Sequence, residues 1–336
     1  MNSRITGIDE TDLLIMVGTN PKTECPVLNA RIRKAVSVNG LDVAVIGPAN
    51  NITYNYSHLG NSLQTLQEIA DGTHPFCERI AQAELPMIMV ANDTLSRKDG
   101  EAIQNLINEI AAKTNVINEA EGWNGVNILH TEASRVGALD LGIVPQHTMN
   151  GAAKLVFLLG ADNFRHEDIP EDAYVIYMGT TGDEGVYYAD LILPTASYLE
   201  KNGTFVNMDG RVQQSRNAVT PPGFARDDWM VLRALSEELG TPLPYDSLDE
   251  VRTRLAEIAP HLVRYDHIET GSFDRLALTN TGDRQVSSAL LTDAVDNFYM
   301  TDPISRNSHI MARCTRELNP AKQDNFKEWV NTWITH

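Results

Sequence analysis

The sequence is poor in cysteine, and this sets the first limit on its chemistry. Cys25, Cys77 and Cys314 are the three cysteines among 336 residues, and they lie far apart without a CxxC pair. A four-thiolate iron-sulfur cluster or structural zinc site needs more thiolates than this chain supplies. The same scarcity argues against a disulfide framework and favours a reducing compartment. We expect each cysteine to be a small, buried or half-buried side chain.

Long apolar runs and an excess of basic charge are also missing. No run approaches the roughly 18 apolar residues that a membrane span needs, so membrane association would require a partner. Lys and Arg number 27 against 45 Asp and Glu, which gives a net charge of −18. This balance argues against nucleic acid as a partner, because a phosphate backbone requires a basic surface. The first 14 residues show no signal-peptide core and no Arg-rich transit pattern, so we expect a mature form, a chain made where it works, or a cytoplasmic chain.

The familiar motifs of catalysis and phosphate binding are missing as well. The sequence has no GxGxxG or GxxxxGK[ST] loop, no HxxxH or HExxH pattern among its nine histidines, and no GxSxG turn. Dinucleotide and P-loop binding, metal-assisted hydrolysis and acyl transfer therefore have no local signature. We assign no catalytic residue, no cofactor-binding residue and no metal ligand from these patterns.

What the sequence does contain is an alternation of apolar strands with helices. The composition, 42% apolar and 21% charged over 336 residues, is typical of a globular protein of about two domains. Strands are expected at residues 11–18, 42–47, 86–91, 126–130, 154–160, 173–179 and 190–193. Helices are expected at residues 23–36, 62–70, 75–84, 100–113, 227–239 and 247–259, the first capped by Thr23. This order predicts an α/β fold with doubly wound, mostly parallel sheets.

Four parts are expected along the chain. Residues 1–97 form a first α/β lobe, whose opening strand has no preceding element to pair with and which a partner chain would complete. Residues 98–200 form a second α/β lobe, and residues 201–264 a hairpin and helices that close it. Asp209-Gly210 is a hairpin signal, and the helix after it opens with Asp227 and Asp228 in its first turn. Residues 265–336 hold a surface crossover or flexible segment up to residue 293, then a helical tail interrupted near Asn319-Pro320.

Two strand ends each allow a functional and a structural interpretation. VGTNP, with Asn20, is a strand-to-helix turn where a helix N-terminus can hold phosphate, or a tight turn in which Asn20 bonds its own backbone. LLGAD places Asp162 at the end of a strand. In nucleotide-binding folds an aspartate at this position often binds ribose, although aspartate there is also a common helix cap. The local pattern favours the structural interpretation of both.

The order of several segments carries a family resemblance. ADLILP, EKNGTFVNMDGRVQ and AVTPPGFARDDW follow one another between residues 189 and 229, and the chain resembles the late part of the molybdopterin oxidoreductase family there. Within that family it looks most like the large iron-sulfur subunit, the 75 kDa type, of respiratory complex I, NADH:ubiquinone oxidoreductase. DNFYMTDPISRNSHIMARC, residues 296–314, resembles the end of that subunit and is not shared with molybdenum enzymes in general. The resemblance covers nearly the whole chain.

The resemblance implies a non-catalytic lobe beside an electron path. That large subunit begins with a cysteine-rich part that holds iron-sulfur clusters, and this chain resembles only its second half. Residues 180–185, which we call the 180–185 loop, read TTGDEG, closer to the complex I form than to the TxTA segment of active molybdenum enzymes. We therefore expect a split subunit without a cofactor of its own, with iron-sulfur clusters on a cysteine-rich partner polypeptide. The resemblance also implies other complex I subunits as partners and the matrix side of the mitochondrial inner membrane.

Two other functions remain open from the sequence. The chain could be the second half of a split but active molybdopterin oxidoreductase, such as a formate dehydrogenase, in which Asn20 and the 180–185 loop would contact the pterin nucleotide. It could also be a free-standing α/β protein that binds a small nucleotide, for which the GTNP turn is the one supporting feature. The residue that ligates molybdenum in the family lies upstream of the region that this chain resembles, so the chain gives no evidence for or against the active form.

Overall fold

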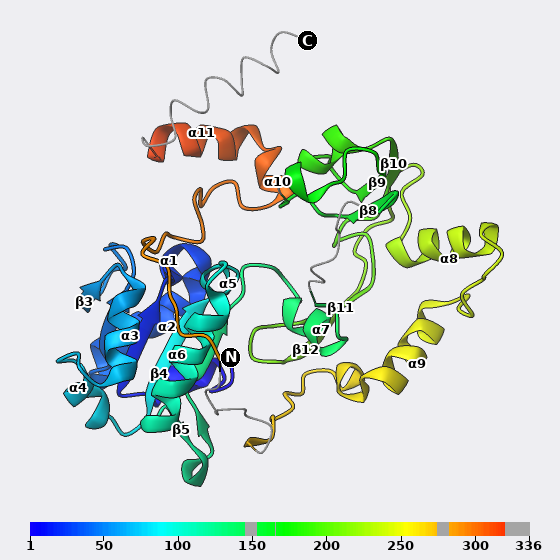
Figure 1. The fold of residues 1–336 in the computed structure, drawn as a ribbon. Helices are drawn as coiled ribbons and strands as arrows, with labels where there is room; N and C mark the ends of the chain where they lie inside the picture. Colours follow the sequence, from blue (N-terminus) through cyan, green and yellow to red (C-terminus); the bar gives the residue numbers. More distant parts are fainter. Residues whose placement is uncertain (145–152, 165, 274–281, 320–336) are drawn as a thin grey trace. The chain divides into compact units, whose positions relative to one another are not determined.

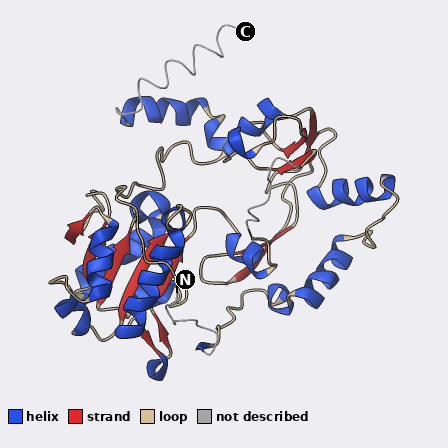
Figure 2. Cartoon of the chain, viewed as in Figure 1, coloured by secondary structure: helices blue, strands red, loops and turns tan. Residues whose placement is uncertain are grey.

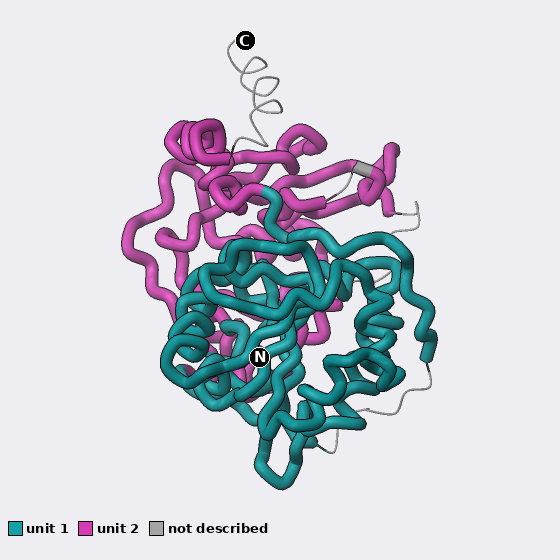
Figure 3. The backbone as a smooth tube through the Cα atoms, turned by 90° about the vertical axis from the view of Figure 1, so that its left-hand side faces the viewer, with its two compact units in different colours: residues 1–137, 206–211, 266–296 teal, residues 138–205, 212–265, 297–336 magenta. Residues whose placement is uncertain are grey.

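The chain divides into two compact units. A computed structural model describes residues 1–144, 153–164, 166–273 and 282–319. Unit 1 comprises residues 1–137, 206–211 and 266–296, and unit 2 comprises residues 138–205, 212–265 and 297–336 (Figure 3). The limits expected from the sequence differ from this division: the boundary at residues 97 and 98 falls inside unit 1, and residues 265–336 are shared between the units.

Unit 1 is built on a five-stranded parallel sheet with the order β3-β2-β1-β4-β7. The strands are β1 (Leu13–Val17), β2 (Asp42–Ile46), β3 (Ser57–Gly60), β4 (Pro86–Ala91) and β7 (Val126–Leu129). The helices between them are α1 (Pro21–Glu24), α2 (Pro26–Asn39), α3 (Leu63–Asp71), α4 (Cys77–Ala81), α5 (Asn92–Leu95) and α6 (Gly100–Lys113). A short antiparallel pair, β5 (Ile117–Asn118) and β6 (Trp123–Asn124), precedes β7.

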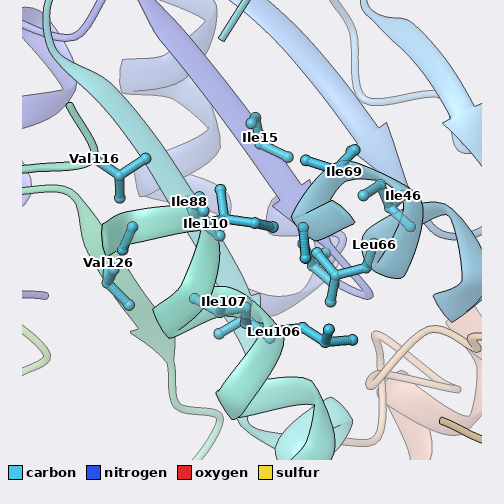
Figure 4. Packing of buried hydrophobic residues seen from close by; sticks show 14 of the residues in the cluster. Ile15, Ile46, Leu66, Ile69, Ile88, Leu106, Ile107, Ile110, Val116 and Val126 are labelled. Carbon is cyan, nitrogen blue, oxygen red and sulfur yellow. The ribbon is translucent and has the colours of Figure 1, made fainter. Parts of the chain in front are cut away.

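The first strand is the centre of this sheet. All five residues of β1 are buried, and β1 pairs with β2 on one side and β4 on the other. Its side chains alternate between two cores: Leu13, Ile15 and Val17 pack with α3 and α6, and Leu14 and Met16 pack with α2. Helices therefore cover both faces of the sheet, as Figure 2 shows and Figure 4 details for the α3 and α6 side. No strand precedes β1 in the chain, as expected, but two later strands pair with it, so neither side of β1 is left for a strand from a partner chain.

The first long helix begins differently from the prediction. Cys25 is the N-cap of α2, its side chain makes no capping hydrogen bond, and Pro26 is the first helical residue. Thr23 instead lies in α1 and donates a side-chain hydrogen bond to the Asn20 carbonyl over 3.1 Å. Pro26 in the first turn was expected, since proline lacks only an N–H that would be unsatisfied there. The prediction that Thr23 caps this helix was wrong.

Unit 2 contains a three-stranded parallel sheet with the order β10-β9-β8. Its strands are β8 (Leu155–Leu159), β9 (Tyr174–Gly179) and β10 (Leu191–Pro194), and β11 (Gly203–Val206) and β12 (Val212–Ser215) form a separate pair. Its helices are α8 (Asp228–Glu238), α9 (Leu248–Ile258), α10 (Pro303–Arg306) and α11 (His309–Leu318), and α7 (Arg135–Asp140) begins at the end of unit 1 (Figure 1). The prediction of an α/β fold with mostly parallel sheets is confirmed.

The local signals after residue 200 are largely confirmed. Gly210, with a positive φ of 82°, lies in the turn between β11 and β12, as the Asp209-Gly210 pair predicted. Ser247 and Glu250 form a capping box at the start of α9. Asp227 is the N-cap of α8 rather than a first-turn residue, and its side chain makes no capping hydrogen bond. Of the expected tail helices, the first is divided into α10 and α11, and whatever follows Asn319 lies outside the described residues.

Candidate functional sites at the carboxyl edges of the sheets

Parallel α/β sheets bind ligands beyond the carboxyl ends of their strands, where the strand order reverses direction. In unit 1 this point lies between β1 and β4, because β2 and β3 extend to one side of β1 and β4 and β7 to the other. The β1 end is Gly18-Thr19-Asn20, which contains the turn singled out from the sequence. Gly18 has a φ of 58°, and a Cβ on it would lie 2.1 Å from Thr94 Oγ1, so a larger residue here would strain the backbone and displace Thr94.

Glu24 organises the polar groups after β1. Its carboxylate accepts hydrogen bonds from Thr19 Oγ1 over 3.0 Å and from the Asn20 backbone N–H. Asn20 is 6% exposed, and its Oδ1 is buried without a hydrogen-bond partner among the described residues. The expected bond from Asn20 to its own backbone is therefore not what holds the turn. Glu24, which no sequence pattern singled out, takes that role.

Several carboxylates lie close together at this edge. Burial raises the pKa of Glu24 above its ordinary value, and the carboxylates of Asp93 and Asp293 raise it further, outweighing the hydrogen bonds from Asn20 and Thr19. The pKa of Asp93 is also raised, by burial and by Glu132. A pyrophosphate needs the opposite environment, namely free N–H groups and positive charge. The residues present at this edge therefore do not fit the phosphates of a nucleotide or pterin dinucleotide.

Glu24→Gln is expected to raise the thermal unfolding midpoint near neutral pH and to have little effect near pH 4. The raised pKa means that the folded state binds the Glu24 proton more tightly than the unfolded state does. Stability from this group is thus complete below its ordinary pKa and is lost as the pH rises through the raised value. Glutamine keeps the shape without the charge. Scanning fluorimetry of the full chain between about pH 4 and pH 8 measures the effect.

Glu84→Gln is the matched control, because Glu84 is an exposed glutamate of the same unit. An equal shift in both variants, or a lower midpoint for Glu24→Gln at neutral pH, would contradict the prediction.

In unit 2 the corresponding edge borders a cavity of about 830 Å³. The carboxyl ends of β8, β9 and β10 form one wall, and α10 and α11 form another. Lys201 and Asp228 are ion-paired at the cavity wall. The remaining lining is mixed, with hydroxyl groups of Thr180, Thr195, Ser305 and Ser308 and apolar side chains of Leu159, Met178, Ile304 and Met311. This cavity is the best candidate for a ligand site in unit 2.

Asp162 accepts hydrogen bonds from two other groups of the chain. It is 8% exposed, and its two carboxylate oxygens accept hydrogen bonds from Tyr177 Oη over 3.1 Å and from the Gly185 backbone N–H over 2.8 Å. Burial, followed by the charge of Asp162, raises the pKa of Tyr177, so its hydroxyl remains a donor. A Cβ at Gly179 or Gly185 would lie 2.4 or 2.6 Å from the Tyr177 ring. Asp162, which also lines the cavity, therefore fastens the 180–185 loop to Tyr177, and each of its oxygens accepts one hydrogen bond from the protein.

The 180–185 loop is also held by the C-terminal part of the chain. Asp183, whose side chain is 6% exposed, is ion-paired with Arg306 at the end of α10. Asn307 Nδ2 donates to the Gly182 carbonyl over 2.8 Å, and Gly182 adopts a φ of 70°. The structure thus brings Asp162 together with the 180–185 loop, whereas Asn20 belongs to unit 1. Sequence reasoning missed Tyr177, because its place in an apolar strand gave no sign of its bond to Asp162. It also missed Arg306 and Asn307, since no local pattern links residues that lie more than a hundred positions apart.

The cysteines offer no set of metal ligands in the described part of the chain. Cys25 and Cys77 lie in unit 1 and Cys314 in unit 2, and all three are half-buried free thiols. Burial, with a contribution from Glu24, raises the pKa of Cys25 to about 11, which keeps it protonated. Metals bind the thiolate form. Across residues 1–144, 153–164, 166–273 and 282–319, no three His, Cys, Asp or Glu side chains are grouped closely enough to hold a metal ion.

No helix in the described ranges combines the length and the apolar character that a bilayer span would require.

Two protein-family models match the sequence. The model described as molybdopterin oxidoreductase matches residues 1–238. A second model, which describes the C-terminal region of an NADH-ubiquinone oxidoreductase subunit, matches residues 267–314, which include α10 and the start of α11. The second match includes Arg306 and Asn307, which contact the 180–185 loop.

The chain is also similar to subunits of one respiratory enzyme. It is 46% identical over 319 residues to the mitochondrial NADH-ubiquinone oxidoreductase 78 kDa subunit of Candida albicans, covering 93% of this chain and 44% of that protein. It is 42% identical over 316 residues to the mitochondrial NADH dehydrogenase [ubiquinone] iron-sulfur protein 1 of Solanum tuberosum, covering 94% and 42%. It is 40% identical over 323 residues to the NADH-ubiquinone oxidoreductase 75 kDa subunit of Reclinomonas americana, covering 94% and 46%. The chain spans less than half the length of these curated relatives.

Proposed function

We propose a function from the premise that this chain belongs to the molybdopterin oxidoreductase family and is homologous to the 75 and 78 kDa subunits of NADH-ubiquinone oxidoreductase. The proposed role is that of a non-catalytic structural lobe in the NADH dehydrogenase module of complex I. Electrons pass from NADH to ubiquinone over iron-sulfur clusters that lie outside these 336 residues, on a cysteine-rich partner. The place of action is the peripheral arm on the matrix side of the mitochondrial inner membrane, in keeping with the mitochondrial names of two of the relatives.

One observation carries the non-catalytic role. The 180–185 loop, which would contact the pterin nucleotide in an active relative, is bound by Arg306 and Asn307 of the same chain. The donors that fasten it belong to the segment matched by the NADH-ubiquinone oxidoreductase model rather than by the molybdopterin model. The carboxylates around Glu24 add a second, independent reason, because they disfavour phosphate at the edge of the other sheet. The three scattered thiols support the location of the clusters outside these 336 residues.

Elemental analysis of the complex that contains this chain is expected to find iron but essentially no molybdenum or tungsten. The complex is isolated through an affinity tag on the chain and assayed for NADH dehydrogenase activity and for metals. The chain purified alone should contain no iron, because it lacks a set of four thiolates. About one molybdenum or tungsten atom per complex would overturn the proposal, and so would the absence of any cysteine-rich partner and of NADH oxidation.

The second candidate is part of an active molybdopterin oxidoreductase of the formate dehydrogenase type. It is favoured by the family match over residues 1–238 and by the buried, unpartnered Asn20 Oδ1 at the end of β1. The metal analysis separates it from the first proposal. A free-standing nucleotide-binding protein, the third possibility, predicts tight equilibrium binding of a guanine or adenine nucleotide to the chain alone.

A further inference from the structure

A segment far along the chain returns to the carboxyl edge of the sheet in unit 1. Residues 283–293, which we call the edge strap, have no regular secondary structure (Figure 1, orange). The strap begins at the flanking helices: Arg284 pairs with Asp71 over 2.6 Å at the end of α3 and with Glu109 over 3.1 Å in α6. These ion pairs fix the start of the strap against the two helices that cover one face of the sheet.

The middle of the strap is anchored after β4. Arg97 donates to the carbonyl groups of Ala289 and Leu290, each over 3.4 Å, and pairs with Asp99 over 2.8 Å. Asp99 in turn accepts a hydrogen bond from the Ser287 backbone N–H over 2.8 Å. Arg97 and Asp99 thus satisfy donors and acceptors of the strap backbone that would otherwise need water.

Leu291 packs the strap against the carboxyl edge of the sheet. It is 2% exposed and belongs to the core cluster that contains Val17 and Val90, the last buried residues of that cluster in β1 and β4. A Cβ at Gly18 would lie 3.4 Å from Leu291 Cδ2, so this side chain packs against the turn that follows β1. The neighbouring Leu290 is 60% exposed, which shows that one of two adjacent leucines points into the fold and the other away from it.

The end of the strap reaches the residues that follow β2 and β3. The Leu291 backbone N–H donates to the Asn61 carbonyl over 3.3 Å, just after β3, and Asn50 Nδ2 donates to Asp293 over 2.7 Å, after β2. The strap therefore contacts the residues that follow β1, β2, β3 and β4. Asp293 also adds to the negative charge around Glu24.

We propose that the edge strap is a built-in occupant that closes the carboxyl edge of this sheet to ligands. It lies where parallel sheets of this kind bind nucleotides, and it presents an apolar side chain and a carboxylate where a nucleotide would need cationic or N–H donors. Because the strap is part of the same chain, it is always present beside the edge. A ligand that binds this edge would have to displace it. The inference rests on the proposed non-catalytic function and gives a physical reason for it.

Hydrogen exchange of the whole complex tests the closure. Amides of residues 283–293 and 17–20 should be protected in the wild type. Leu291→Ala should accelerate exchange in both segments by about tenfold or more, because it removes the buried anchor. Leu290→Ala, an exposed neighbour in the same strap, is the matched control and should change neither segment. Arg97→Ala is a second variant outside the apolar core, and it should accelerate exchange of residues 287–291 and 17–20.

Two results would overturn the closure. One is exchange of residues 283–293 in the wild type at the rate of an unstructured peptide. The other is faster exchange of the strap in Arg97→Ala or Leu291→Ala with no change at residues 17–20, which would show that the strap does not cover the edge. The outcome is independent of the metal analysis: molybdenum in the complex with a protected strap would refute the proposed function and leave the closure standing.

Discussion

Arg306→Met is expected to destabilise the 180–185 loop by about 3 kcal/mol, because it leaves a carboxylate buried without a counter-charge. The Asp183 side chain is 6% exposed and its ion pair with Arg306 is the contact that compensates its burial. Methionine keeps much of the length of arginine but neither the charge nor the donors. Native-state hydrogen exchange of the amides of residues 180–188 in increasing urea measures the free energy of local opening.

Two further variants separate the charge from the packing. The double variant Asp183→Asn with Arg306→Met should recover most of the loss, since a neutral amide costs much less to bury than an unpaired carboxylate. Arg306→Lys should be intermediate, because lysine restores the charge without the planar donor geometry. An opening free energy equal to that of the wild type in Arg306→Met would show that the pair does not hold the loop. The main support for the non-catalytic role would then be lost.

Asp162→Ala is expected to lower the stability of unit 2 by about 3 kcal/mol, because two buried donors lose their acceptor. These donors are Tyr177 Oη and the Gly185 backbone N–H, at 3.1 and 2.8 Å from the Asp162 carboxylate. Asp162→Asn keeps one acceptor oxygen and should cost about 1 kcal/mol. Thermal unfolding followed by circular dichroism compares the three proteins at one pH.

Tyr177→Phe completes this test, since it removes one of the two donors and leaves the ring between Gly179 and Gly185. Coupling between the Asp162 and Tyr177 substitutions in a double-mutant cycle identifies the hydrogen bond as their shared interaction. If Asp162→Ala unfolds at the wild-type temperature, the carboxylate has no structural role. Its interpretation as a ligand for ribose would then regain support.

The two predictions rest on the same observation. Groups suited to ligand binding are hydrogen-bonded or ion-paired to other residues of the same chain. Asp162 and Asp183 lie at or beside the carboxyl edge of the sheet in unit 2, and both are buried and bonded. The turn after β1 is covered by the edge strap in the same way. In a fold that usually leaves such edges open, internal partners of this kind are consistent with a structural rather than a catalytic lobe.

Regular elements were predictable where the chain signals them locally. β4 and α6 span the predicted residues, because a six-residue apolar run indicates a buried strand and Ile103, Leu106, Ile107 and Ile110 repeat with helical spacing. β3 was missed, because Ser57–Gly60 is polar and short and pairs only through a neighbour that the sequence does not identify. Thr23 was mistaken for a cap because a tight turn and a helix start share the same residue types.

The candidate sites were predictable only in part, for a similar reason. Asn20, Asp162 and the 180–185 loop stand out because they follow apolar strands, and the carboxyl ends of such strands gather at one edge of a sheet. The side chains that decide what those residues do come from elsewhere: Arg306 and Asn307 hold the loop, and Leu291 and Asp293 reach the β1 edge. No periodicity in the sequence specifies a contact between residues separated by more than a hundred positions.

The sequence by itself determined the α/β class, most strands and helices, the scarcity of thiolates and the resemblance to a family of redox enzymes. These follow from local propensity, apolar spacing and residue counts, which need no knowledge of distant neighbours. The tertiary structure alone decided that the first strand is central and that residues 283–293 cover its carboxyl edge. It also decided that Asp183 is neutralised by Arg306, because burial and charge pairing are properties of the packed chain rather than of any segment.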